Sequence, residues 1–237
     1  MIYLTGDTHG NFGKLRRFAA SDEGSRLTKK DYVIVLGDFG VWSDTVDEIV
    51  LLEGELPFTL LFLDGNHEDF GLLCSMPEKS MFGGRVRDLG GVYHLGRGEV
   101  YEIPDGEGSK TVAVCGGGTS RDRDMRTEGV DWFPEEEITE CDVARMLESV
   151  ARRGGKVDAF LSHSPSSEVK FELFAEASFS MRKPATSYIP SESEYRIRNM
   201  IGRIETPLCF SGHEHIDRKL AFSGKEYRIV YNDFIRL

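Results

Sequence analysis

The feature that most constrains this chain is a short apolar run that ends abruptly in a polar turn, because it recurs at least five times. In the clearest copy, residues 58–63 are followed by Asp64-Gly65-Asn66-His67-Glu68. An apolar run of this length with aromatic content is typical of a buried strand. Because α/β proteins bind ligands beyond the carboxyl ends of such strands, we expect the polar turns to meet.

The other copies carry different polar residues at the same relative position. They follow the apolar runs at residues 1–4, 31–36, 157–161 and 208–210. Their turns read Thr5-Gly6-Asp7-Thr8-His9-Gly10, Gly37-Asp38-Phe39-Gly40, Ser162-His163-Ser164-Pro165 and Ser211-Gly212-His213-Glu214-His215. A glycine in most of these turns lets the backbone turn sharply and approach its neighbours closely.

The segments between these strands indicate helices and hairpins. Short alternating runs at residues 81–109 predict antiparallel hairpins. Residues 166–204 are expected to be mainly helical apart from a loop around 183–190, and one or two strands are expected within 226–236. Strands and helices alternate throughout without a long linker, which favours a single domain over residues 1–237.

Together the turns offer carboxylates, imidazoles and one carboxamide. Five of the six histidines lie in them. A single histidine after a strand is more often a surface or core residue than a ligand, but five at equivalent positions indicate a metal site. The candidates are Asp7, His9, Asp38, Asn66, His67, His163, His213 and His215.

The donor chemistry favours transition metals over calcium and magnesium, since imidazole nitrogens are prominent in it. The set exceeds the needs of one ion and, with one bridging carboxylate, fits two divalent ions. Manganese is the first choice, with iron, zinc, cobalt and nickel as alternatives. Two such ions about 3.5–4 Å apart can hold a hydroxide and clamp both ends of an in-line displacement at phosphorus.

In their order and spacing, these motifs resemble those of the calcineurin-like metallophosphoesterases. The matching blocks are Asp7-x-His9, Gly37-Asp38, Gly65-Asn66-His67-Glu68, His163 and Gly212-His213-x-His215. The resemblance implies an α/β fold, a four-layer α-β-β-α sandwich with two mixed β-sheets. It also implies a metal-dependent phosphoesterase, either phosphatase or phosphodiesterase, acting through a hydroxide that bridges two metal ions.

The resemblance also implies a role for each residue. One ion would be held by Asp7, His9, Asp38 and His215. Asp38 would bridge to the second ion. The other ligands of that ion would be Asn66, His163 and His213. His67 would bind no metal but would contact the phosphate and protonate the leaving oxygen.

The chain departs from some branches of the family. Val41 stands where many members have aspartate or tyrosine, and without that tyrosine the chain does not resemble a purple acid phosphatase. Asp69 and Phe70 stand where serine/threonine phosphatases have an arginine, which argues against protein phosphatase activity. The motifs at residues 5–10 and 37–40 and the segment Trp132-Phe133-Pro134-Glu135 look similar to those of small bacterial and prophage members.

A loop after the strand at residues 111–115 contains three arginines. Arg121, Arg123 and Arg126 could bind the substrate phosphate together with His67. The alternative is a solvated loop whose arginines pair with the aspartates between them, and the sequence does not favour either interpretation.

Three other features are predicted to be structural. His94 lies inside an alternating run typical of a strand. Gly116-Gly117-Gly118 lacks the spacing and the lysine of a phosphate-binding loop, so a tight turn is expected. For Trp132 and Phe133 a core or interface role is favoured over a position in the cleft wall.

The net charge of −11 argues against binding to long nucleic acid, so a small phosphoester substrate is expected. No apolar run approaches the ~18 residues that a membrane span needs, and no membrane partner is expected. The chain begins with a strand-like run and not a signal segment, which favours a cytoplasmic location. A metal-dependent nuclease and a non-catalytic binding protein that keeps the fold are the alternative functions.

Overall fold

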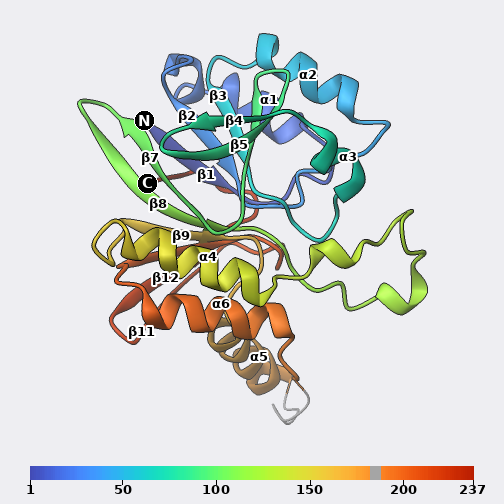
Figure 1. Cartoon of the computed structure of the whole chain (residues 1–237), viewed down its shortest axis with the longest axis vertical. Helices are drawn as coiled ribbons and strands as arrows, with labels where there is room; N and C mark the ends of the chain where they lie inside the picture. Colours follow the sequence, from blue (N-terminus) through green and yellow to red (C-terminus); the bar gives the residue numbers. More distant parts are fainter. Residues whose placement is uncertain (182–187) are drawn as a thin grey trace.

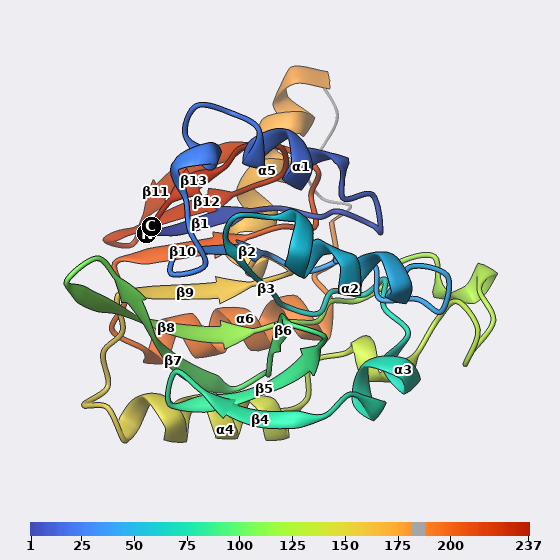
Figure 2. The same cartoon turned by 90° about the horizontal axis from the view of Figure 1, so that it is seen from above.

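The computed structural model describes residues 1–181 and 188–237. Two β-sheets lie face to face, and helices cover the outer face of each (Figures 1 and 2). This is the four-layer α/β sandwich that the sequence predicts. Most of the expected loop around residues 183–190 lies outside the described residues.

The first sheet has seven strands in the order β13-β1-β2-β3-β6-β5-β4. They are β1 (Ile2–Thr5), β2 (Tyr32–Val35), β3 (Thr59–Phe62), β4 (Glu78–Met81), β5 (Gly84–Leu89), β6 (Val92–Leu95) and β13 (Ile235–Arg236). Strands β1, β2, β3 and β6 pair in parallel, so their carboxyl ends lie at the same edge. The remaining pairs are antiparallel, and β5 with β6 forms one of the predicted hairpins.

The second sheet has six strands in the order β11-β12-β10-β9-β8-β7. They are β7 (Glu99–Asp105), β8 (Gly108–Cys115), β9 (Ala159–Ser162), β10 (Leu208–Ser211), β11 (Arg218–Phe222) and β12 (Lys225–Ile229). Strands β8, β9, β10 and β12 are parallel. Sequence reasoning missed β11 because this edge strand is mostly exposed and carries no buried apolar run.

Each sheet has its own helical layer (Figure 1). The first is covered by α1 (Gly13–Ala19), α2 (Val46–Glu55) and α3 (Phe70–Ser75). The second is covered by α4 (Glu140–Ala151), α5 (Ser167–Met181) and α6 (Glu192–Arg203). Short 3₁₀ turns are η1 (Gly24–Arg26), η2 (Arg123–Met125) and η3 (Pro134–Glu136). None of the helices in the described part of the chain has the length and apolar character to cross a membrane.

Successive residues of the central strands pack into different cores. In β1, Ile2 and Leu4 lie between the two sheets, whereas Tyr3 lies under the helices of the first sheet. In β2, Ile34 lies between the sheets and Val33 lies under the helices. Both faces of these strands are covered, which explains why they read as continuous apolar runs and not as alternating ones.

Candidate active site

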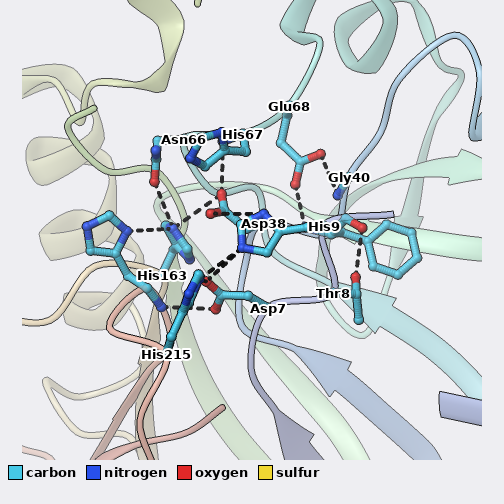
Figure 3. Close-up of polar contacts among 12 residues, drawn as sticks. Asp7, Thr8, His9, Asp38, Gly40, Asn66, His67, Glu68, His163 and His215 are labelled. Atoms are coloured by element: carbon cyan, nitrogen blue, oxygen red, sulfur yellow. Dashed lines mark hydrogen bonds and ion pairs between the residues drawn. The ribbon is translucent and has the colours of Figure 1, made fainter. Parts of the chain in front are cut away.

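The predicted ligands lie in the turns that follow five parallel strands, and these turns meet at one edge of the sandwich (Figure 3). The first sheet contributes three turns. The turn after β1 carries Asp7 and His9, the turn after β2 carries Asp38, and the turn after β3 carries Asn66. The second sheet contributes two turns. The turn after β9 carries His163, and the turn after β10 carries His213 and His215.

One group of donors contains Asp7, His9 and His215, whose ligand atoms all lie within 4.8 Å of one another. The Nε2 atoms of His9 and His215 are 2.9 Å apart. His215 Nε2 is also 3.1 Å from Asp7 Oδ2. Imidazole nitrogens and a carboxylate oxygen that converge in this way could hold a metal ion.

A second group contains Asp38, His163 and His213, again with ligand atoms within 4.8 Å of one another. His163 Nε2 lies 3.3 Å from Asp38 Oδ1 and 3.2 Å from His213 Nδ1. Asn66 joins this group, because its Oδ1 lies 3.1 Å from His163 Nε2. The structure therefore brings all seven predicted ligands together.

Asp38 lies between the two groups. Its Oδ1 is 3.3 Å from His163 Nε2, while its Oδ2 is 3.7 Å from His9 Nδ1. One carboxylate oxygen thus faces each group. This is the geometry that a bridging ligand requires.

Burial and neighbouring charges set the protonation states of the site. Burial by itself would raise the pKa of Asp7, but the hydrogen bond from His215 and the nearby imidazoles bring that pKa below its ordinary value. Burial lowers the pKa of His213 well below its ordinary value. At neutral pH Asp7 is therefore ionised and His213 is neutral, which are the states that bind metal ions.

The backbone of these turns is strained. Positive φ angles are unusual for residues other than glycine and concentrate at functional sites. In the described part of the chain, four predicted ligands have them: His9 (48°), Asp38 (45°), His213 (68°) and His215 (52°).

Two glycines permit the close approach of the strand ends. A Cβ at Gly37, which has φ of +88°, would lie 2.3 Å from the ring of His163. A Cβ at Gly65 would lie 2.0 Å from Asp38 Oδ1. Any side chain at these positions would push apart the strand ends that carry Asp38, Asn66 and His163, as the sequence led us to expect.

These residues fit two divalent ions. His215 Nε2 lies 2.9 Å from His9 Nε2 and 3.1 Å from Asp7 Oδ2, so three donor atoms converge on one small region. A cation could accept lone pairs from all of these atoms at once. The mixed nitrogen and oxygen donor set suits manganese, iron, zinc, cobalt or nickel.

His67 lies beside the donor groups but, among the described residues, belongs to neither of them. Its backbone N–H donates to Asp38 Oδ1 at 2.8 Å. Its ring packs against the ring of His9 with centroids 5.4 Å apart. Burial lowers its pKa below the ordinary value. The ring is thus in a position to contact a substrate without binding an ion.

The three arginines of the loop after β8 occupy different environments. Arg126 Nη1 lies 3.0 Å from His67 Nδ1, and its Nη2 pairs with Asp122 at 2.8 Å. Arg121 pairs with Glu194 on α6, and the side chain of Arg123 is about half exposed. The structure therefore places the Arg126 guanidinium against His67, whereas that of Arg121 pairs with Glu194.

Glu68 supports the site, although sequence reasoning gave it no role. It is fully buried and accepts backbone N–H bonds from Phe39, Gly40 and Val41 at 2.7, 3.1 and 2.6 Å. Burial raises its pKa well above the ordinary value. These bonds fix the turn that carries Asp38. The only signal in the sequence was its place in the turn after β3.

Lys14 on α1 supports the site from the other side. Its Nζ donates to the carbonyl oxygens of Gly6, Asp7 and Tyr231. Tyr231 in turn stacks on His215 with ring centroids 4.7 Å apart. Lys14 thereby joins the turn after β1 to the C-terminal segment, and nothing near it in the sequence indicates this.

His94 and Phe133 have structural environments. His94 is buried, with its Nε2 2.8 Å from Asp64 Oδ1, which agrees with the structural role expected of it. Phe133 packs against Trp42 and Phe70, with ring centroids 6.2 Å apart in both pairs. These contacts favour the core role of Phe133 over a place in the cleft wall.

Comparison with known proteins assigns the chain to a protein family. The model of the family described as calcineurin-like phosphoesterase matches residues 1–217. A search of curated proteins gives no match.

Solved structures share the fold at low identity. The protein TT1561 of Thermus thermophilus is 10% identical with a TM-score of 0.56, over 98% of this chain and 89% of that one. A Staphylococcus aureus protein described as a 5′-nucleotidase, in complex with alpha-ketoglutarate, is 14% identical with a TM-score of 0.50, over 98% of this chain and 48% of that one. The phosphopantetheinyl hydrolase of Mycobacterium tuberculosis is 16% identical with a TM-score of 0.46, over 98% of this chain and 89% of that one.

Proposed function

The chain belongs to the calcineurin-like phosphoesterase family, and from this premise we propose that it hydrolyses small phosphate esters with the help of two divalent metal ions. The observation that carries the proposal is the position of Asp38, whose two carboxylate oxygens face one donor group each. A carboxylate so placed can serve two ions at once.

The proposed ligands divide as the two donor groups do. One ion would be held by Asp7, His9, Asp38 and His215. The other would be held by Asp38, Asn66, His163 and His213. Divalent ions held there would lower the pKa of a water molecule and neutralise the oxygens of the phosphate. Each group takes residues from both sheets, so the proposal treats residues 1–237 as one domain.

His67 is proposed to act on the leaving group. Its ring lies beside the donor groups, and burial lowers its pKa. A bound phosphate anion would raise that pKa again, because an opposite charge nearby favours the imidazolium. His67 would then contact a phosphate oxygen and donate a proton to the leaving oxygen.

Arg126 is proposed to bind the phosphate together with His67. Its guanidinium is within hydrogen-bonding distance of the imidazole, so both can reach the same anion. Charge-assisted bonds from a guanidinium to phosphate are strong and can be bidentate. Asp122, which holds Arg126 at 2.8 Å, would orient the guanidinium.

A panel of phosphoesters tests the proposal. Purified protein supplied with Mn²⁺ should hydrolyse some member of a set containing p-nitrophenyl phosphate, its bis ester, nucleotides and short cyclic nucleotides. The Asp38→Asn variant is the control for contaminating hydrolases. Ions bound without turnover of any ester would favour a non-catalytic binding protein. Rapid degradation of plasmid DNA would favour a nuclease.

A further inference from the structure

A buried chain of hydrogen bonds leads from Asn66 through Ser120 to Glu136. Asn66 Nδ2 donates to Ser120 Oγ at 3.0 Å, and Ser120 Oγ donates to Glu136 Oε2 at 2.7 Å. All three side chains are almost completely buried. We propose that Ser120 and Glu136 are positioning residues that hold the Asn66 carboxamide with its oxygen toward the second donor group. The inference rests on the proposed metal centre.

The direction of the chain follows from the supply of protons. Ser120 N donates to Glu136 Oε1 at 2.6 Å, so both oxygens of this carboxylate accept bonds from Ser120. Burial raises the pKa of Glu136, whereas its two hydrogen bonds from Ser120 lower it and favour the carboxylate. An ionised carboxylate has no proton to donate, so the single proton of the serine hydroxyl points to Glu136. Ser120 Oγ can therefore only accept a bond from Asn66. The NH₂ group of Asn66 must face the serine.

The opposite end of the carboxamide faces the proposed metal position. Asn66 Oδ1 lies 3.1 Å from His163 Nε2 in the second donor group. The oxygen and the NH₂ group have almost the same size, so packing alone does not distinguish the two orientations of the amide. A flipped amide would present N–H bonds to a cation and could not bind it. The hydrogen-bonded chain therefore selects the orientation that binds an ion.

Glu136 is itself held by Arg97, which lies in the loop between β6 and β7. Arg97 donates to the carbonyl oxygen of Glu136 at 3.1 Å and to Asp64 Oδ2 at 2.6 Å. Asp64 is buried and also contacts His94 Nε2 at 2.8 Å. Arg97 thereby ties η3, which precedes α4, to the turn after β3, which carries Asn66. The acceptor and the amide that it orients thus keep a fixed separation.

The triple glycine after β8 makes this approach possible. A Cβ at Gly116 would lie 2.4 Å from Asp64 Oδ1. A Cβ at Gly117, which has φ of +91°, would lie 2.6 Å from the carbonyl oxygen of Glu136. Side chains at these positions would separate the Ser120 loop from Asn66. Close packing against Asp64 and Glu136 therefore explains why glycines stand at these positions.

Glu136→Gln tests the inference because it reverses the direction of the hydrogen bonds between Asn66, Ser120 and residue 136 with little change of side-chain shape. Glutamine must still accept from Ser120 N, so its NH₂ group donates to Ser120 Oγ. The serine proton then points to Asn66, which must turn its oxygen toward the serine. Mn²⁺ affinity at the second site should fall about 10–100-fold, as for other residues that orient metal ligands. Equilibrium dialysis followed by elemental analysis should give one ion per chain where the parent chain gives two.

Glu137→Gln is the matched control. The Glu137 carboxylate accepts bonds from Thr119 and Ser193 at 2.8 and 2.7 Å, and neither bond is part of the chain to Asn66. This variant loses the same charge one residue away and should bind two ions. Ser120→Ala should also weaken the second site, and Ser120→Thr should restore it because the hydroxyl is kept.

A double variant separates orientation from general damage to the fold. Asn66→Asp presents an oxygen in either orientation, so adding Glu136→Gln to it should no longer lower the metal content. Two ions bound by Glu136→Gln with unchanged Mn²⁺ affinity would overturn the inference and leave the proposed function intact. Absence of bound ions from the parent chain would overturn both.

Discussion

The floor of the site and the arginine loop above it are built in opposite ways. The floor consists of turns after parallel strands, and Asp7, Asp38 and His163 in it are buried and fixed by hydrogen bonds from distant segments. The loop at residues 121–133 projects from the sandwich (Figures 1 and 2), and Met125 within it is 85% exposed. The buried carboxylates and His163 of the floor are thus fixed by several segments, whereas the side chains of the loop make fewer contacts and are largely exposed.

This difference separates two tasks of the site. Ligands that must stand within a few ångströms of one another need positions fixed by the core, since small displacements abolish binding. A loop that contacts the outer part of a substrate can vary without disturbing them. We therefore expect substitutions in the floor to change metal content, and substitutions in the loop to change only substrate binding.

The largest effect is expected for Asp38→Asn. Its carboxylate faces both donor groups, so its loss should lower the occupancy of both ions and remove nearly all turnover. Elemental analysis of protein purified without chelator should fall from between one and two transition-metal ions per chain to well below one. A variant that keeps the full metal content would show that Asp38 is not a bridge. The expectation that substitutions in the floor change metal content would then be wrong.

His67→Gln tests the boundary between the two regions. The ring lies beside the floor but outside both donor groups, so both ions should remain bound. Turnover should fall by ~10²–10⁴-fold, the usual value of general acid–base catalysis. Elemental analysis and steady-state kinetics on the same preparation measure the two effects. Loss of metal together with activity would instead identify His67 as a metal ligand that belongs to the floor.

Arg126→Ala should affect only substrate binding. Hydrogen bonds between charged groups contribute about 1.5–3 kcal/mol, which corresponds to a loss of about 10–100-fold in kcat/KM. Arg123→Ala is the control within the same loop, because this side chain is about half exposed and 3.9 Å from Glu137. It should change kcat/KM less than twofold, about the size of a surface charge effect. Equal effects in the two variants would mean that the loop acts as a diffuse positive patch.

The smallest effect is expected from salt. One arginine at the site and a net charge of −11 leave little surface for a polynucleotide backbone. Hydrolysis of long duplex DNA should be slow and should change little between about 50 and 200 mM salt, because few counterions would be released. A steep fall of DNA cleavage with salt would instead indicate several phosphate contacts, and the loop would then belong to a nucleic-acid surface.

Most of the fold could be predicted because its signals are local. Buried strands read as apolar runs, and helices that cover them alternate with these runs along the chain. Strand β11 was missed because it lies at a sheet edge, where little apolar surface is buried and the sequence carries no periodic signal. The seven candidate ligands could be named from the sequence because each stands in the turn after such a run, at the end of a strand whose direction the parallel pairing fixes.

The supporting residues could not be predicted in this way. Lys14 donates to the carbonyl of Tyr231 across 217 residues of sequence, and Asn66 donates to Ser120 across 54. Sequence alone did not distinguish Arg126 from Arg121, because both stand in the same loop near Asp122 and Asp124.

The sequence by itself therefore determined where the strands end and which donor atoms stand after them. Only the tertiary structure decided which arginine faces His67 and which buried groups orient Asn66. The physical reason is that a strand buried on both faces must be apolar at consecutive positions, so a short stretch of sequence is enough to recognise it. The partner of a hydrogen bond depends instead on which distant segments the two sheets bring within about 3 Å of each other.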